Sequence, residues 1–157
     1  AAWNTPYDSD QVLVVLDRGH TTTTNIIETG KFVVAIPHEG QIADINRVGS
    51  IHGRDSGDKF AWAKITPVTS EVLGIKTLPD ALAYIECELV DLETLKKTGV
   101  CIGKAVNITV KEELWDEEHS SFAAGFAKTL HYISEDAYYT NGKIVRVEEN
   151  FMNMTND

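Results

Sequence analysis

The chain has 157 residues, enough for one domain with a hydrophobic core, because a domain of this size hides roughly two-thirds of its unfolded surface. With 43% hydrophobic and 24% charged residues, 11 Gly and 4 Pro, its composition excludes collagen-like, low-complexity and disordered classes. The 14 Lys and Arg against 24 Asp and Glu leave a net charge of -10, which opposes nucleic-acid binding in the absence of a cation cluster.

The first third of the chain predicts a strand, a helix and a second strand. Gln11–Asp17 and Lys31–Pro37 are β-branched runs of strand length, and proline ends the second. Between them, Thr21–Thr29 fits a two-turn helix with threonines available at its start and Gly30 just past its end.

Two short helices and a long hairpin are expected next. Glu39–Val48 has apolar residues three apart, as in an amphipathic helix, and Gly57–Ala63 predicts another helix. Leu82–Leu92 and Val100–Lys111 are rich in Val, Ile and Tyr, and the polar segment Glu93–Gly99 joins them. This pattern predicts an antiparallel hairpin.

The second hairpin strand alternates apolar and polar residues, which predicts one buried and one wet face. The apolar set, expected inside, is Val106, Ile108 and Val110, and the polar set is Asn107, Thr109 and Lys111. Residues 116–121 resemble an exposed turn, Phe122–Tyr132 a helix, and Lys143–Val147 a last strand. Strands dominate without a repeated strand–helix alternation, so we expect a mainly β fold, a small barrel with short helical inserts.

Sequence patterns for membrane spans, disulfides and metals are missing. The longest apolar runs fall far short of the ~20 residues of a membrane helix, and no signal peptide is visible. Cys87 and Cys101 could face each other across the hairpin, but two strand cysteines are expected to be small core residues. The five histidines lack metal-ligand spacing. We therefore expect a cytoplasmic protein with no metal, membrane or nucleic-acid partner.

Two polar loops are the candidate sites, since the common hydrolase, P-loop and zinc motifs are absent. In Asp17–Thr24, DRGHTTTT, an arginine and hydroxyls meet the free N–H groups of a helix start, which is anion-binding chemistry. A plain helix cap with a solvated arginine is the alternative. In Gly49–Phe60, GSIHGRDSGDKF, three glycines would let backbone approach a flat ligand. A flexible surface connection is the alternative there.

Several segments resemble one family. TGKFVVAIP at Thr29–Pro37 is similar to its T-G-x-F-V-V-N-x-P stretch, and Gly49–Phe60 to its G-S-x-S-G-R-D-x-D-K-F segment. AAWNTP at Ala1–Pro6, the Ile102–Gly103 step and the close at Tyr138–Tyr139 with Gly142 also match. The chain thus resembles the flavin reductase-like, FMN-binding split barrels, which include flavoredoxin and the small flavin reductases.

The resemblance implies a Greek-key split barrel that binds FMN non-covalently at a homodimer interface and transfers hydride or electrons through it. The implied phosphate ligands are Arg18, Thr22 and Thr23. The implied contacts to the ribityl chain and ring are Ala2, Trp3, Asn4, Ser50, Gly53 and Lys59. A cation such as Lys59 near a flavin ring would stabilise its reduced form.

One departure affects the electron donor. Many reductases of this group carry a histidine, associated with the pyridine-nucleotide side of the flavin, five residues before the glycine of the Ile102–Gly103 step, where this chain has Thr98. The donor is therefore open between NADH or NADPH and a redox protein, as in a flavoredoxin-like carrier. A non-catalytic module that binds flavin or haem, and a structural domain without cofactor, are the alternatives to an oxidoreductase.

The chain begins Ala1-Ala2-Trp3, without methionine. In the resembled family a strand or two precede the segment similar to AAWNTP. We therefore expect residues 1–157 to form one split-barrel domain that lacks its N-terminal strand or strands, so that part of a flavin site would lie outside this sequence.

Overall fold

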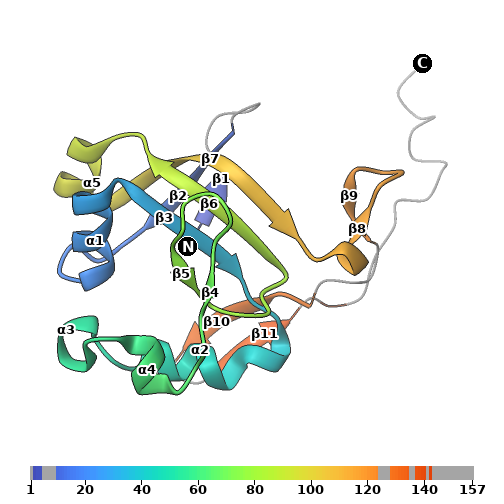
Figure 1. The fold of residues 1–157 in the computed structure, drawn as a ribbon, viewed down its shortest axis with the longest axis horizontal. Helices are drawn as coiled ribbons and strands as arrows, with labels where there is room; N and C mark the ends of the chain where they lie inside the picture. The colour runs from blue at the N-terminus through green and yellow to red at the C-terminus, as the bar shows by residue number, and fades with distance from the viewer. Residues whose placement is uncertain (1, 5–9, 124–127, 135–136, 141, 143–157) are drawn as a thin grey trace, which may run out of the picture.

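Five antiparallel strands form the main sheet of the computed structural model, which describes residues 2–4, 10–123, 128–134, 137–140 and 142 (Figure 1). Consecutive strands of this sheet, β3 (Lys31–Ile36), β6 (Ala83–Leu89) and β7 (Val100–Val110), are neighbours. The strand β2 (Gln11–Val15), which the helix α1 (Thr21–Thr29) connects to β3, lies beside β7, and this is a Greek-key order. The mainly β fold class is confirmed. In spatial order the strands are β1 (Ala2–Asn4), β2 (Gln11–Val15), β7 (Val100–Val110), β6 (Ala83–Leu89) and β3 (Lys31–Ile36).

Short helices and two-stranded ribbons surround this sheet (Figure 1). The helical elements are α1 (Thr21–Thr29), η1 (Glu39–Gln41), α2 (Ile42–Gly49), α3 (Gly53–Ser56), α4 (Lys59–Ala63), α5 (Leu92–Thr98) and η2 (Glu112–Leu114). The ribbons pair β4 (Val68–Thr69) with β5 (Lys76–Thr77), β8 (Trp115–Asp116) with β9 (Ser121–Phe122), and β10 (Leu130–Ser134) with β11 (Ala137–Thr140). Within the described part of the chain, no helix is long and apolar enough to cross a membrane.

The helix α1 has the predicted bounds, Thr21–Thr29. Gly30 ends it in the left-handed region, with φ 69°, and donates its N–H to the Ile26 carbonyl at 2.8 Å. Its start differs from the prediction, because the N-cap is His20, whose side chain makes no capping hydrogen bond. The threonines already belong to the helix, and its first N–H groups are left without a side-chain cap.

The helical region after β3 is more divided than predicted. The expected helix at 39–48 splits into η1 and α2, and the helix expected at 57–63 begins at Lys59. Asp58 fixes that start, since its Oδ1 accepts hydrogen bonds from the N–H groups of Phe60 and Ala61 at 2.9 and 3.3 Å. The single turn α3 was not predicted, because the four residues GRDS carry no apolar periodicity.

The predicted hairpin is confirmed, with β6 and β7 paired from Ala83 opposite Val110 to Leu89 opposite Gly103. Its connection is not a plain loop but the helix α5. Asp91 caps this helix by accepting from the Thr94 N–H at 2.9 Å and from the Thr94 hydroxyl at 2.6 Å.

The C-terminal region contains strands where a helix was expected. The exposed turn at 116–121 is confirmed as the β8–β9 hairpin, in which Asp116 accepts from the His119 N–H at 3.1 Å. The helix predicted at 122–132 is wrong, because the described residues there begin and end in β9 and β10, and β10 pairs with β11. The strand predicted at 143–147 lies outside the described residues.

The core lies between the sheet and the helices α1 and α5. Its buried members are Ile26, Phe32, Cys87, Leu95 and Cys101. Both cysteines are free and fully buried, which confirms them as core residues. Gly103 lies against this core, and a Cβ there would be 2.9 Å from Cys87 Cβ and would overlap the Phe32 ring.

The β7 strand shows the predicted alternation with its faces reversed. Val106 and Ile108 are 38% and 61% exposed, whereas Asn107 and Thr109 are half-buried. A β-bulge shifts the β6–β7 register between Glu86 and Cys87, and Glu86 accepts a hydrogen bond from Asn107 on the covered side. The prediction of burial is therefore wrong within one chain for Val106 and Ile108, whereas Val110 is half-buried, and the two exposed side chains are available to another surface.

Candidate functional site

The two polar loops singled out in the sequence meet at one hollow of about 280 Å³. Contacts between α1 and α3 bring the loops together. The hollow is lined by His20, Thr21 and Thr22 from the start of α1 and by Gly49, Ile51, His52, Gly53 and Lys59 from the second loop. Three of the predicted site residues, Thr22, Gly53 and Lys59, therefore share one site.

The start of α1 supplies hydrogen-bond donors to this hollow. The first helical hydrogen bonds are made by the N–H groups of Thr23 and Thr24, both to the His20 carbonyl. The N–H groups of Thr21 and Thr22 precede them, and in an α-helix these groups have no partner within the helix. Together with the positive end of the helix dipole, they favour an anion.

A glycine allows the two loops to approach. A Cβ at Gly53 would lie 2.9 Å from Thr21 Oγ1 and 3.0 Å from Thr21 Cβ, which is too close for any larger residue without movement. The sequence reasoning assigned Gly53 to contact with a flat ligand. Its position against Thr21 adds a second reason for glycine, which is close packing of the two loops.

Lys59 is the lysine among the described residues that line the hollow. Its Nζ donates to the Val48 carbonyl at 3.0 Å, so the half-buried side chain is held rather than free in solvent. An ammonium group has three donors. Two remain for a ligand in the hollow.

The other predicted site residues do not line this hollow. The Thr23 side chain is fully buried and its hydroxyl donates to the Asp17 carbonyl at 2.7 Å. Arg18 donates to the Lys97 carbonyl at the end of α5 at 3.2 Å, and Ser50 donates to the Arg47 carbonyl at 2.9 Å. Ala2, Trp3 and Asn4 form β1 at the edge of the sheet, paired with β2. Their roles at a ligand stay predictions.

The sequence reasoning missed two histidines of the site. The rings of His20 and His52 lie 5.0 Å apart between centroids, tilted by 58°, although 32 positions separate them in the sequence. No spacing pattern signals such a pair. Only the pairing of the two loops in space could have identified it.

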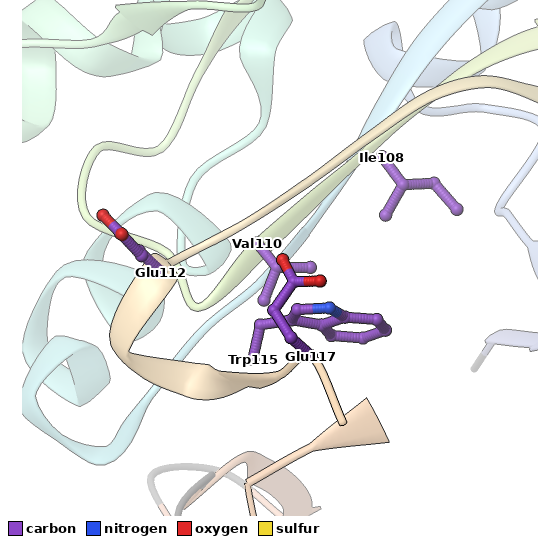
Figure 2. Close-up of a pocket in the computed structure, with 5 residues that line it drawn as sticks. All are labelled: Ile108, Val110, Glu112, Trp115 and Glu117. Atoms are coloured by element: carbon purple, nitrogen blue, oxygen red, sulfur yellow. The ribbon is translucent and has the colours of Figure 1, made fainter. Parts of the chain in front are cut away.

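A second and larger hollow, of about 770 Å³, lies at the far end of β7. Figure 2 shows Val110 and the Trp115 indole close together, with Ile108 facing the same space and the Glu117 carboxylate beside the indole. The remaining lining residue is Glu112. Among the described residues that line it, the apolar side chains are joined by two carboxylates and by no cation that could contact a phosphate.

A buried carboxylate outside both hollows holds a loop against the sheet. Glu86, only 1% exposed, accepts from the N–H groups of Val72 and Leu73 at 3.1 and 2.6 Å and from Asn107 Nδ2 at 2.9 Å. Burial by itself would raise the pKa of Glu86, but the hydrogen bonds it accepts outweigh burial and lower the pKa to about 2. Its satisfied oxygens indicate a structural role.

The protein-family model described as the flavin reductase like domain matches residues 1–146 of the sequence. This chain belongs to the flavin reductase-like family. Among solved structures, family members of the same split-barrel fold include the flavoredoxin of Desulfovibrio vulgaris, with a TM-score of 0.79 at 21% identity, covering 94% of this chain and 79% of that one. An FMN-binding domain of a flavin reductase-like enzyme from Shewanella baltica aligns with a TM-score of 0.77 at 20% identity, over 88% of this chain and 74% of that one. Nitrilotriacetate monooxygenase component B from Bacillus cereus gives 0.68 at 26% identity, over 87% and 70%.

Proposed function

We propose that this chain is an FMN-dependent oxidoreductase that holds the FMN phosphate in the hollow between its two polar loops. The observation that carries the proposal is the meeting of the α1 N-terminus with Thr22 and Lys59 in one place. Unpaired N–H groups, a hydroxyl and an ammonium are the donors that a phosphate takes. The chain has a net charge of -10, so this local set of donors, not the overall field, favours the anion.

The residues of the hollow would bind and orient the ligand. The α1 N–H groups and the Thr22 hydroxyl bind phosphate oxygens, and Lys59, anchored on Val48, provides the charge. The resemblance implies Lys59 at the flavin ring, and its place in one hollow with Thr22 supports the phosphate role instead. Gly53 keeps the two walls close enough for both to reach the same group. Bound FMN supplies the redox chemistry, accepting hydride or electrons and passing them on.

A homodimer would complete the site. The hollow of about 280 Å³ lies just below the roughly 300–1,000 Å³ of pockets that enclose a whole small ligand, so it fits the phosphate end of FMN and leaves the ring to other surfaces. One chain also leaves Ile108 and Trp115 exposed at the second hollow (Figure 2), and Val106, two positions before Ile108 on β7, is exposed as well. An apolar surface of this kind is typical of an interface. We place the second subunit there.

The residue at position 98 bears on which electron donor reduces the bound FMN. Thr98 stands at the position where many reductases of this group carry histidine, and its hydroxyl donates to the Thr94 carbonyl at 2.8 Å and accepts from the Val100 N–H at 3.0 Å. Both hydrogen bonds are local and structural. This favours a redox protein as the donor, in a flavoredoxin-like role, over direct oxidation of NADH or NADPH.

Two assays decide between these functions. Consumption of NADH or NADPH under air with excess FMN would establish a flavin reductase. Bound FMN that a chemical reductant reduces and a redox protein reoxidises, without pyridine-nucleotide turnover, would establish the carrier. Bound flavin that exchanges electrons with neither a pyridine nucleotide nor a redox protein would indicate the non-catalytic flavin-binding module. Threonine instead of histidine at position 98 is compatible with that alternative as well.

The binding site is tested by titrating FMN against variants. Lys59→Met should weaken FMN binding about tenfold or more, as expected for one lost charge-assisted hydrogen bond. Lys96→Met is the matched control, because Lys96 lies on α5 in a surface ion pair with Glu93. Arg18→Ala in the same titration decides whether Arg18 contacts the phosphate or only the end of α5. Equal affinities of the Lys59 and Lys96 variants would contradict the proposed site.

A further inference from the structure

Neither histidine of the pair at the hollow caps the helix that it precedes. His20 is the N-cap of α1, yet its imidazole makes no capping hydrogen bond, and His52 precedes α3 in the same way. Both side chains are accessible, that of His20 being 49% exposed. Histidine is also a poor choice where only a cap is needed, because Ser, Thr, Asp and Asn are the residues that cap best.

We propose that His20 and His52 bind the terminal phosphate of the flavin as a proton-linked pair, so that the chain selects FMN over riboflavin and holds FMN more tightly as the pH falls. The inference rests on the proposed function. Imidazole is the side chain whose charge ordinarily changes between pH 5 and 8. Two imidazolium rings 5.0 Å apart repel each other, whereas a phosphate dianion bound beside both favours their protonation.

Charged groups of both signs lie around the pair. Asp17 Oδ2 lies 3.9 Å from His20 Nε2, and Asp17 Oδ1 accepts from the Gly19 N–H at 2.7 Å. Lys59, an ammonium, lies on the wall of the same hollow.

Charged groups described on α3 and at the start of α4 have ion-pair partners of their own. On α3, Arg54 Nε lies 3.9 Å from Asp55 Oδ1. At the start of α4, Asp58 Oδ2 lies 3.7 Å from Lys76 Nζ. Arg18, two positions before His20, donates a hydrogen bond to the Lys97 carbonyl on α5. The bound phosphate is therefore the strongest new charge that the two imidazoles would meet.

The phosphate's own titration acts in the opposite direction, which makes the effect distinctive. A phosphate monoester gains its second negative charge near pH 6, so FMN alone should bind a permanent cation as tightly or more tightly when the pH rises. A protein site built on histidine should instead lose FMN affinity over the same range. The slope of affinity against pH thus separates the two cases.

The test is a fluorescence titration of the full chain with FMN and with riboflavin, at pH 6.5 and 8.5. The wild type should lose about tenfold in FMN affinity between these values, and its riboflavin affinity should stay level. His20→Gln and His52→Gln should each reduce the FMN preference and flatten the slope, with unchanged riboflavin binding as the sign of an intact fold. His52→Lys should bind FMN tightly at both pH values. His119→Gln, in the β8–β9 turn with Asp116, is the matched control and should behave as the wild type.

Variants that keep the wild-type slope, or a riboflavin affinity that falls with pH as much as that of FMN, would overturn the inference and leave the proposed function standing. A wild type that binds neither flavin would overturn both.

Discussion

The exposed apolar face of β7 predicts how strongly one substitution should weaken the dimer. Ile108 is 61% exposed in one chain. Full burial of such a side chain is worth about 1.5–3 kcal/mol, so covering the exposed part is worth about 1–2 kcal/mol. A two-fold interface contains the residue twice. Ile108→Ser should therefore cost about 2–4 kcal/mol, a 30- to 1,000-fold weaker association.

Sedimentation over a range of concentrations measures this directly. Val90→Ser is the control, because Val90 is also 50% exposed but lies between β6 and α5, away from the second hollow. The control should dimerise as the wild type does, and Ile108→Ser should be monomeric at concentrations where both are dimers. A wild type that binds flavin as a monomer, or two variants with equal association, would refute the reasoning.

Three further predictions concern the fold. Glu86→Gln should lower the free energy of unfolding by about 2–3 kcal/mol, measured by urea denaturation, because an amide cannot accept hydrogen bonds at both positions. In the wild type, the low pKa of Glu86 means that its contribution is complete above about pH 4.5 and is lost as the pH falls toward 2; a stability that is level across this range, or that Glu86→Gln leaves unchanged, would contradict this role. Gly103→Ala should cost about 1–3 kcal/mol in the same assay, since its Cβ overlaps the Phe32 ring, and no loss would mean that the strands part there. Burial raises the pKa of the Cys87 thiol to about 12 and that of Cys101 to about 11, so a disulfide reagent at pH 8 should modify them only after unfolding; fast reaction of the native chain would place a thiol at the surface.

Much of the fold could be predicted because local patterns and burial agree in the first half of the chain. The strands at β2 and β3 and the helix α1 have clear apolar runs and, at Gly30, a clear stop signal. Sequence patterns do not identify the helix α5, because its seven residues include only two leucines and its cap at Asp91 lies two positions before Glu93–Gly99, the polar segment expected to join the hairpin strands.

The reversed face of β7 could not be predicted from alternation alone. Alternation indicates that two faces differ, but it does not say which one the same chain covers. Here the loop held by Glu86 covers the polar face of Asn107, and the apolar face remains open. A prediction made from one chain assumes that its apolar side chains are buried by that same chain. In a dimer, the second subunit can bury them instead.

The candidate site was predicted in part for a similar reason. Each loop carries its own signal, the hydroxyls and helix start in one and the glycines in the other, so Thr22, Gly53 and Lys59 could be selected. That the two loops form one hollow depends on tertiary contacts between α1 and α3. The pairing of His20 with His52, and the contact of Arg18 with the end of α5, follow from those contacts and have no sequence pattern.

FMN binding itself is the most direct test of the account. The purified chain, incubated with FMN and desalted, should keep the absorbance band of oxidised flavin at about 450 nm. The predicted result is one bound flavin per wild-type chain and less bound flavin in the Lys59→Met variant. A colourless chain after reconstitution would contradict the central claim that the hollow between the two loops holds FMN.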